Sequence, residues 1–135
     1  MTDKNSHFDT RAIHAGQDFD PTTGAVIPPV YLTSTFVQKG IGQLHNGYEY
    51  GRASNPTRTA LQDLLASLEG GRVGLSFASG LAAEDALLRA ALKPGDHVVL
   101  GNDVYGGTHR LINRIHGAWG ITNTVVDMSN LFEVQ

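Results

Sequence analysis

Three short segments of this sequence carry groups that could bind a small anionic ligand. The first is residues 78–83, where Ser79 and Gly80 join an apolar run to a helical pattern. A helix that begins there offers free backbone N–H groups and the positive end of its dipole, which suits a phosphate. Gly80 would let the backbone approach that ligand closely. A plain capped helix also fits these residues, and neither a dinucleotide-binding glycine motif nor a P-loop occurs here.

The second segment is residues 48–52, just before a helix-start signal at Asn55. Tyr50 and Arg52 lie two positions apart, so in an extended chain their side chains point to the same side. The planar fork of arginine binds phosphate, and a tyrosine hydroxyl adds a donor. A surface arginine beside two packing tyrosines fits these residues equally well.

The third segment is residues 103–110, which follows a strand candidate and therefore reaches the same sheet edge as Gly80. Tyr105 could stack on a planar ring bound at that edge. Arg110, close to a helix start, could bind a substrate carboxylate. The spacing is also compatible with a glycine turn followed by a surface helix.

Composition excludes several other classes of chemistry. The 135 residues include no cysteine, which rules out disulfides, thiolate metal sites and a cysteine nucleophile. The six histidines form no metal motif, since His109 and His116 are seven positions apart, and no GxSxG hydrolase elbow occurs. Glu84 and Asp85 are interpreted as a solvated helix face. A net charge of −3 argues against nucleic-acid binding.

The sequence shows neither a membrane-spanning run nor a signal peptide, so we expect a cytoplasmic protein. Residues 1–54 have no helical period and many glycines and prolines, which is unusual inside a compact domain. Their apolar content favours an ordered arm that packs on a neighbouring subunit.

From residue 55 the pattern alternates between helices and strands. Asn55 and Pro56 are typical of a helix start, and leucines at 61, 64, 65 and 68 share one face until Gly70. Strands are predicted at residues 73–78, 97–100 and 121–126, and helices at 81–92 and 108–116. The order indicates an α/β domain over 55–135 with a parallel sheet flanked by helices.

The last residues begin a helix that stops after one turn. Ser129 is a good N-cap, and Leu131, Phe132 and Val134 start an apolar pattern. A single turn is unstable alone, and sheets of this kind usually have more than three strands. We therefore expect the N-terminal part of a longer protein, with the α/β domain incomplete.

Four ordered segments resemble the pyridoxal-phosphate (PLP) enzymes of cysteine and methionine metabolism, and within them the bacterial cystathionine γ-synthase branch. They are YEYGRASNPTR (48–58), FASGLAA (77–83), KPGDHVVLGNDVYGGTHRL (93–111) and the earlier stretch 12–36. The resemblance implies fold-type I, with an N-terminal arm and a large α/β cofactor domain. It also implies a homotetramer built from active dimers.

The resemblance implies a role for each matching residue. Gly80 and Leu81 match backbone amides that hold the cofactor phosphate, and Tyr50 and Arg52 match residues that reach that phosphate from the neighbouring subunit. Tyr105 matches the tyrosine that stacks on the pyridine ring and assists proton transfer.

Three further positions bear on the substrate. Arg110 and Glu49 match positions that face the substrate in the synthase and lyase branches. Gly107 stands where methionine γ-lyases usually have a cysteine, which makes that branch a poorer match.

The resemblance also implies residues that this chain lacks. The family needs a Schiff-base lysine and an aspartate that pairs with the pyridine nitrogen. None of the three lysines, Lys4, Lys39 and Lys93, fits the family's lysine motif. We expect both residues beyond Gln135 and expect this chain alone to be inactive.

The implied activity is γ-replacement: an O-acyl-homoserine and cysteine give cystathionine, in methionine biosynthesis. Cystathionine γ-lyase and O-acyl-homoserine sulfhydrylase remain alternatives within the family. A non-catalytic interaction segment is the alternative from a different class, should the chain end at Gln135.

Overall fold

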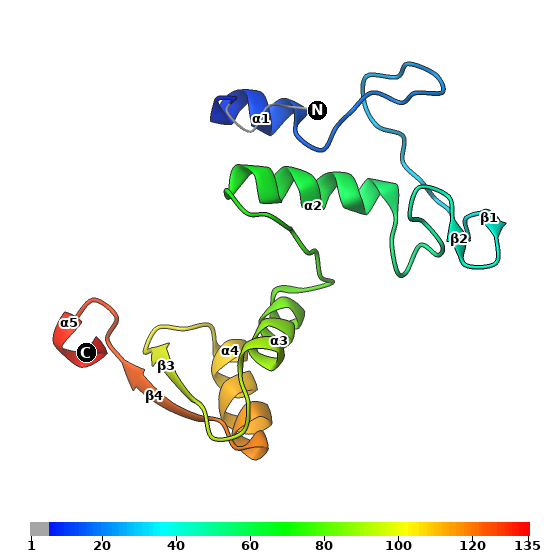
Figure 1. Cartoon of the computed structure of the whole chain (residues 1–135). Coiled ribbons are helices and arrows are strands. Elements are labelled where there is room, and N and C mark those ends of the chain that lie inside the picture. Colours follow the sequence, from blue (N-terminus) through cyan, green and yellow to red (C-terminus); the bar gives the residue numbers. More distant parts are fainter. Residues whose placement is uncertain (1–5) are drawn as a thin grey trace. The chain divides into compact units, whose positions relative to one another are not determined.

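The computed structural model describes residues 6–135, which divide into a first compact unit that ends at Ser76 and a second unit, Phe77–Gln135 (Figure 1). Lys4 lies outside the described residues. The division places the helix that follows Asn55 in one unit with the preceding arm. Packing of residues 1–54 on a neighbouring subunit stays a prediction. No helix among the described residues is long and apolar enough to cross a membrane.

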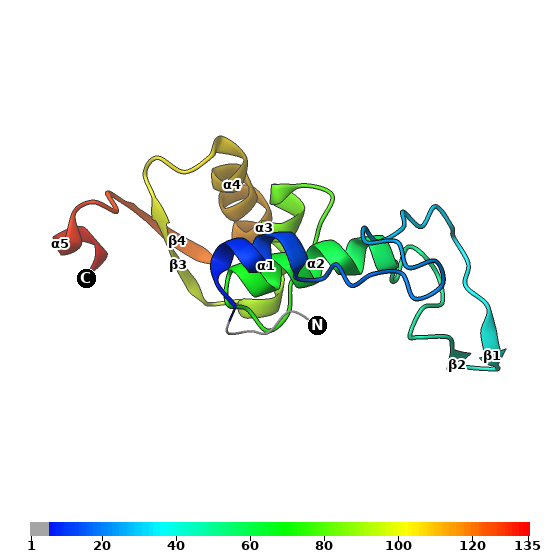
Figure 2. The same cartoon turned by 90° about the horizontal axis from the view of Figure 1, so that it is seen from above.

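The first unit holds two helices, α1 (Phe8–His14) and α2 (Pro56–Leu68), which lie side by side (Figures 1 and 2). A hairpin of two very short strands, β1 (Gln38–Gly40) and β2 (Gln43–Leu44), lies in the arm between them. Gly16 lets the chain pass close to α2, because a Cβ there would lie 2.4 Å from the Ala60 carbonyl oxygen. The Arg11 guanidinium donates to the Ser67 carbonyl.

Helix α1 corrects the expectation of an arm without helical structure. Its seven residues are too few to show a helical period and too few for a stable helix in isolation. The contacts with α2 supply the missing stability, and these come from residues some fifty positions away.

Helix α2 confirms the predicted start and end. The Asn55 Oδ1 accepts the Thr57 N–H at 2.9 Å, and Pro56 occupies the first helical position. The helix ends at Leu68, and Gly70 follows with a φ of +66°.

The strand predicted at residues 73–78 is absent from this structure. The segment is extended but pairs with no other strand among the described residues, and a strand requires such a partner. Gly74 instead lies close to α2, where a Cβ would be 2.3 Å from the Gln62 carbonyl oxygen.

The second unit is a β–α–β arrangement preceded by a helix (Figure 1). Helix α3 (Gly80–Ala91) leads to β3 (His97–Gly101), which pairs in parallel with β4 (Thr122–Val126). The connection is α4 (Gly106–Arg110), which continues through a π-helical segment, η1 (Leu111–His116), and a 3₁₀ turn, η2 (Gly117–Trp119). The helix predicted at 81–92 and the strands predicted at 97–100 and 121–126 are confirmed, and the helix predicted at 108–116 is present but begins two residues earlier, at Gly106. The parallel pairing is the one expected of an α/β fold.

The short helix α5 (Leu131–Val134) begins one residue later than predicted. Asn130 is its N-cap, with its side-chain oxygen accepting the Phe132 N–H at 3.1 Å. The predicted cap, Ser129, instead donates its hydroxyl to Asp127 at 2.7 Å.

Two neighbouring carboxylates tie α3 to the crossover helix, which corrects their interpretation as a solvated face. Glu84 accepts from the Thr108 hydroxyl at 2.6 Å, and Asp85 accepts from the Arg89 Nε at 2.9 Å. Asp85 also bonds the Nε2 of His116, at 2.9 Å, and the His116 side chain is fully buried. The apolar core beside this network includes Ile112, 3% exposed.

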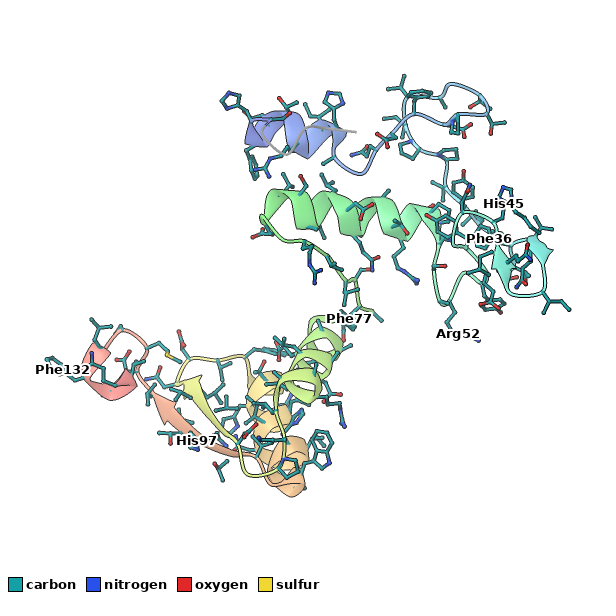
Figure 3. All side chains as sticks on the ribbon, in the orientation of Figure 1. Phe36, His45, Arg52, Phe77, His97 and Phe132 are labelled. Carbon is teal, nitrogen blue, oxygen red and sulfur yellow. The ribbon has the colours of Figure 1, made fainter. Side chains whose placement is uncertain are left out.

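On the exposed side of the sheet, His97 of β3 bonds two threonines of β4. Its ring nitrogens lie 2.7 Å from the Thr122 hydroxyl and 3.0 Å from the Thr124 hydroxyl (Figure 3). These contacts add side-chain bonds to the parallel backbone ladder.

The Asp85 network makes stability depend on pH. The hydrogen bond from Arg89, with further contributions from His116, lowers the pKa of Asp85 below its ordinary 3.8. Because the folded-state value is lowered, the stabilisation is complete above pH 3.8 and is lost as the pH falls through the folded-state pKa. Asp85→Asn should therefore lower the urea midpoint at pH 7, and this deficit should shrink in acid.

Asp103→Asn is the matched control, because Asp103 is exposed and has no hydrogen bond or ion pair within the described residues. Its urea midpoint should follow the wild type at every pH. A deficit in Asp85→Asn that stays constant down to pH 2 would contradict the ionic role.

Candidate functional site

The predicted site residues belong to both compact units, and each group is formed within its own unit. Glu49, Tyr50 and Arg52 lie in the first unit. Gly80, Leu81, Tyr105 and Arg110 lie in the second.

The start of α3 presents two backbone amides without a partner. Ser79 caps the helix, with its Oγ accepting the Ala82 N–H and its carbonyl accepting the Ala83 N–H, both at 3.1 Å. The amides of Gly80 and Leu81 have no hydrogen-bond partner within residues 6–135. Two free N–H groups at the positive end of a helix fit a phosphate.

Gly80 is not required by the protein's own packing. A Cβ at this position would meet no atom within 4 Å, and its φ is not positive. A glycine that neither packing nor backbone geometry requires is consistent with close approach of a ligand.

The starts of α3 and α4 lie close together at Leu81, Tyr105 and Gly107. A Cβ on the buried Gly107 would lie 2.4 Å from Tyr105 Cε1 and 2.9 Å from Leu81 Cδ1. The Tyr105 ring therefore lies across Gly107, and the residue is 69% exposed. An exposed aromatic face beside free amides fits a flat heteroaromatic ring that carries a phosphate.

Arg110 lies one turn further along α4. It lines a shallow pocket with Leu81 and Gly107, and its guanidinium has no hydrogen bond or ion pair within the described part of the chain. Such a cation can bind a carboxylate. The sequence analysis missed Arg114, which lines the same pocket; its i, i+4 spacing from Arg110 is the signal that could have found it.

In the first unit, Tyr50 and Arg52 lie together, as their spacing predicts. The Arg52 guanidinium carbon is 4.7 Å from the centre of the Tyr50 ring, a cation–π contact. Glu49 lines the same open pocket, and a bridge to Thr35 fixes the Tyr50 backbone. Figure 3 shows Arg52 on the loop that precedes α2.

These residues fit the two parts of pyridoxal phosphate. The amides at the α3 start and, in the other unit, the Arg52 guanidinium are groups that can donate to a phosphate, and the exposed Tyr105 ring can stack on a heteroaromatic ring. Among the described residues, no group of three or more side chains is arranged to hold a metal ion.

Comparisons with known proteins agree with this chemistry. The sequence model of a family described as "Cys/Met metabolism PLP-dependent enzyme" matches residues 9–135. The chain is 52% identical over 122 residues to cystathionine γ-synthase of Mycobacterium tuberculosis, covering 90% of this chain and 31% of that protein. It is 50% identical over 128 residues to cystathionine β-lyase of Coxiella burnetii, covering 94% of this chain and 33% of that protein.

Solved structures agree on the fold. The crystal structure of metB from Corynebacterium glutamicum matches with a TM-score of 0.93 and 48% identity, covering 99% of this chain and 35% of that one. Cystathionine γ-lyase from Lactobacillus plantarum, complexed with L-serine, matches with a TM-score of 0.85 and 48% identity, covering 96% and 33%. This chain thus spans about a third of the length of the proteins it matches.

The close approach at Gly107 can be tested by adding one methyl group. Gly107→Ala places a Cβ 2.4 Å from the Tyr105 ring, so the ring should move by about 1 Å to restore carbon–carbon contact. Crystal structures of the whole protein would measure this shift.

Gly106→Ala is the matched control on the same turn. Its Cβ would meet only the end of the Arg110 side chain, at an ordinary 3.5 Å, so Tyr105 should stay in place. If the Tyr105 ring stayed in place in Gly107→Ala, the distance between the ring and residue 107 would have to be longer than in this structure.

Proposed function

We propose that the whole protein is a cystathionine γ-synthase. The premise is that this chain belongs to the Cys/Met metabolism family of PLP-dependent enzymes. It would join cysteine to an O-acyl-homoserine by γ-replacement. The observation that carries this proposal is the start of α3, where two free amides lie beside the exposed Tyr105 ring and the free Arg110 guanidinium.

Residues of both units would hold the cofactor. The Gly80 and Leu81 amides would bind its phosphate, and Tyr105 would stack on its ring. Tyr50 and Arg52 would contact the same phosphate from a neighbouring subunit, which makes a homodimer the smallest active assembly and a homotetramer the complete one. When bound, pyridoxal phosphate supplies an electron sink for negative charge at the substrate carbons.

The remaining residues would act on the substrate. Arg110 would bind its carboxylate and so fix its orientation. The Tyr105 hydroxyl, with its exposed position, would exchange a proton with the substrate. Glu49, in the pocket with Arg52, would face the substrate's other end.

Two lyase reactions remain second candidates, each favoured by a specific observation. The similarity to a solved cystathionine γ-lyase favours cleavage of cystathionine at the γ-carbon, and that to cystathionine β-lyases favours cleavage at the β-carbon. An O-acyl-homoserine sulfhydrylase would use the same ester with sulfide.

A product assay on the whole protein separates these reactions. With pyridoxal phosphate, cysteine and either O-succinyl- or O-acetyl-homoserine, we expect cystathionine as the main product. With cystathionine alone we expect much slower release of cysteine or homocysteine. Faster cleavage of cystathionine than synthesis would overturn the synthase proposal and assign a lyase.

Arg110→Ala adds a residue-level check in the same assay. Loss of the carboxylate contact should raise KM for the ester by about tenfold or more, since a charged hydrogen bond contributes about 1.5–3 kcal/mol. The variant should still bind the cofactor. Arg72→Ala is the matched control, because Arg72 is exposed and lies outside both site groups, and its KM should equal that of the wild type. Arg89→Ala is unsuitable, because Arg89 bonds Asp85.

A further inference from the structure

We propose that Arg58, on the first turn of α2, is a positioning residue for the phosphate-binding pair Tyr50 and Arg52. The inference rests on the proposed function, because it concerns the same phosphate. It adds a residue that touches no part of the cofactor and acts through the loop 50–54.

Arg58 bonds three consecutive carbonyls of this loop. Its Nη2 donates to the Ala53 carbonyl at 2.6 Å, and its guanidinium also lies 3.4 Å from the Arg52 carbonyl and 3.5 Å from the Gly51 carbonyl. A guanidinium can contact several acceptors at once because its donors form a rigid fork, which a lysine lacks. Arg58 thus holds the backbone of Arg52 on both sides.

Several other backbone groups of the loop are paired without Arg58. The Tyr50 carbonyl accepts the amides of Ala53 and Ser54, both at 2.9 Å, and the Gly51 amide donates to Ser34 at 2.6 Å. Without Arg58, the carbonyls of residues 51–53 would have no partner among the described residues. The loop would lose the contacts that hold it against α2.

The positive charge of Arg58 lies where the helix dipole opposes it. Arg58 occupies the first turn of α2, where the helix dipole disfavours a cation, and no acidic residue stands in that turn. The three carbonyls compensate that charge. The loop that Arg58 bonds carries a second cation, Arg52, so the positive charge around the loop favours an incoming phosphate.

The test compares two ligands on the whole protein freed of cofactor: pyridoxal phosphate and pyridoxal, which has the same ring without the phosphate. Arg58→Ala should weaken pyridoxal phosphate binding about tenfold or more, because a charged hydrogen-bond network fixes the phosphate donors. Its affinity for pyridoxal should stay within about twofold of wild type. Arg52→Ala should show the same selective loss.

Arg58→Lys and Arg72→Ala complete the set. The lysine keeps the charge but not the fork, so it should retain only part of the affinity. Arg72 is exposed and has no hydrogen bond or ion pair within residues 6–135, so its alanine variant should bind both ligands as wild type does. Millimolar guanidinium should restore part of the affinity of Arg58→Ala for pyridoxal phosphate and leave the affinity of Arg72→Ala unchanged.

The outcomes distinguish the inference from the function on which it rests. If the wild type does not prefer pyridoxal phosphate over pyridoxal, the proposed function fails. If the wild type shows the preference and Arg58→Lys and Arg58→Ala both keep it, the positioning role alone is wrong. Equal losses for both ligands in the Arg58 variants would assign Arg58 to general folding and also overturn the inference.

Discussion

The first unit depends on hydrogen bonds that the start of α2 makes to a chain with almost no regular structure of its own. Backbone N–H and C=O groups need partners, and strands of three and two residues supply few of them. Asn55 donates to the Tyr31 carbonyl at 3.0 Å, Thr57 accepts the Tyr31 N–H at 2.9 Å, and Arg58 bonds residues 51–53. One helical turn therefore holds two separate parts of the arm, and the second of them carries the Tyr50–Arg52 pair.

In the second unit, the polar side chains that join the helices are different from the polar groups without a partner at the helix starts. Glu84, Asp85 and His116 are used to join α3 to the crossover helix, and the absence of a side chain at Gly107 lets the two helix starts approach. Groups without a partner among the described residues lie at that junction, including two amides of α3 and the Arg110 guanidinium. A ligand that bound there, as we propose, would meet donors already held in place by hydrogen bonds and packing within the protein, which is the condition for a pre-organised site.

Local signals predicted much of this arrangement. In the caps at Asn55 and Ser79, a side-chain oxygen accepts a backbone N–H only two or three residues away, so their chemistry is readable in the sequence. The same holds for the Tyr50–Arg52 spacing. By contrast, Glu84 and Asp85 look like any pair of surface carboxylates, because their partners Thr108 and His116 lie 24 and 31 positions away.

The sequence by itself determined the α/β class, the starts of α2 and α3 and the parallel strand pair, and it predicts the short segments that we propose bind a phosphate and a ring. Tertiary structure decided the rest: α1 exists because α2 supports it, residues 73–78 pair with no strand among the described residues, and Glu84 and Asp85 find partners on the crossover helix. The physical reason is range. Caps and periodicity are satisfied within one or two turns, whereas a side chain's role in holding a loop depends on which backbone groups the fold leaves unpaired.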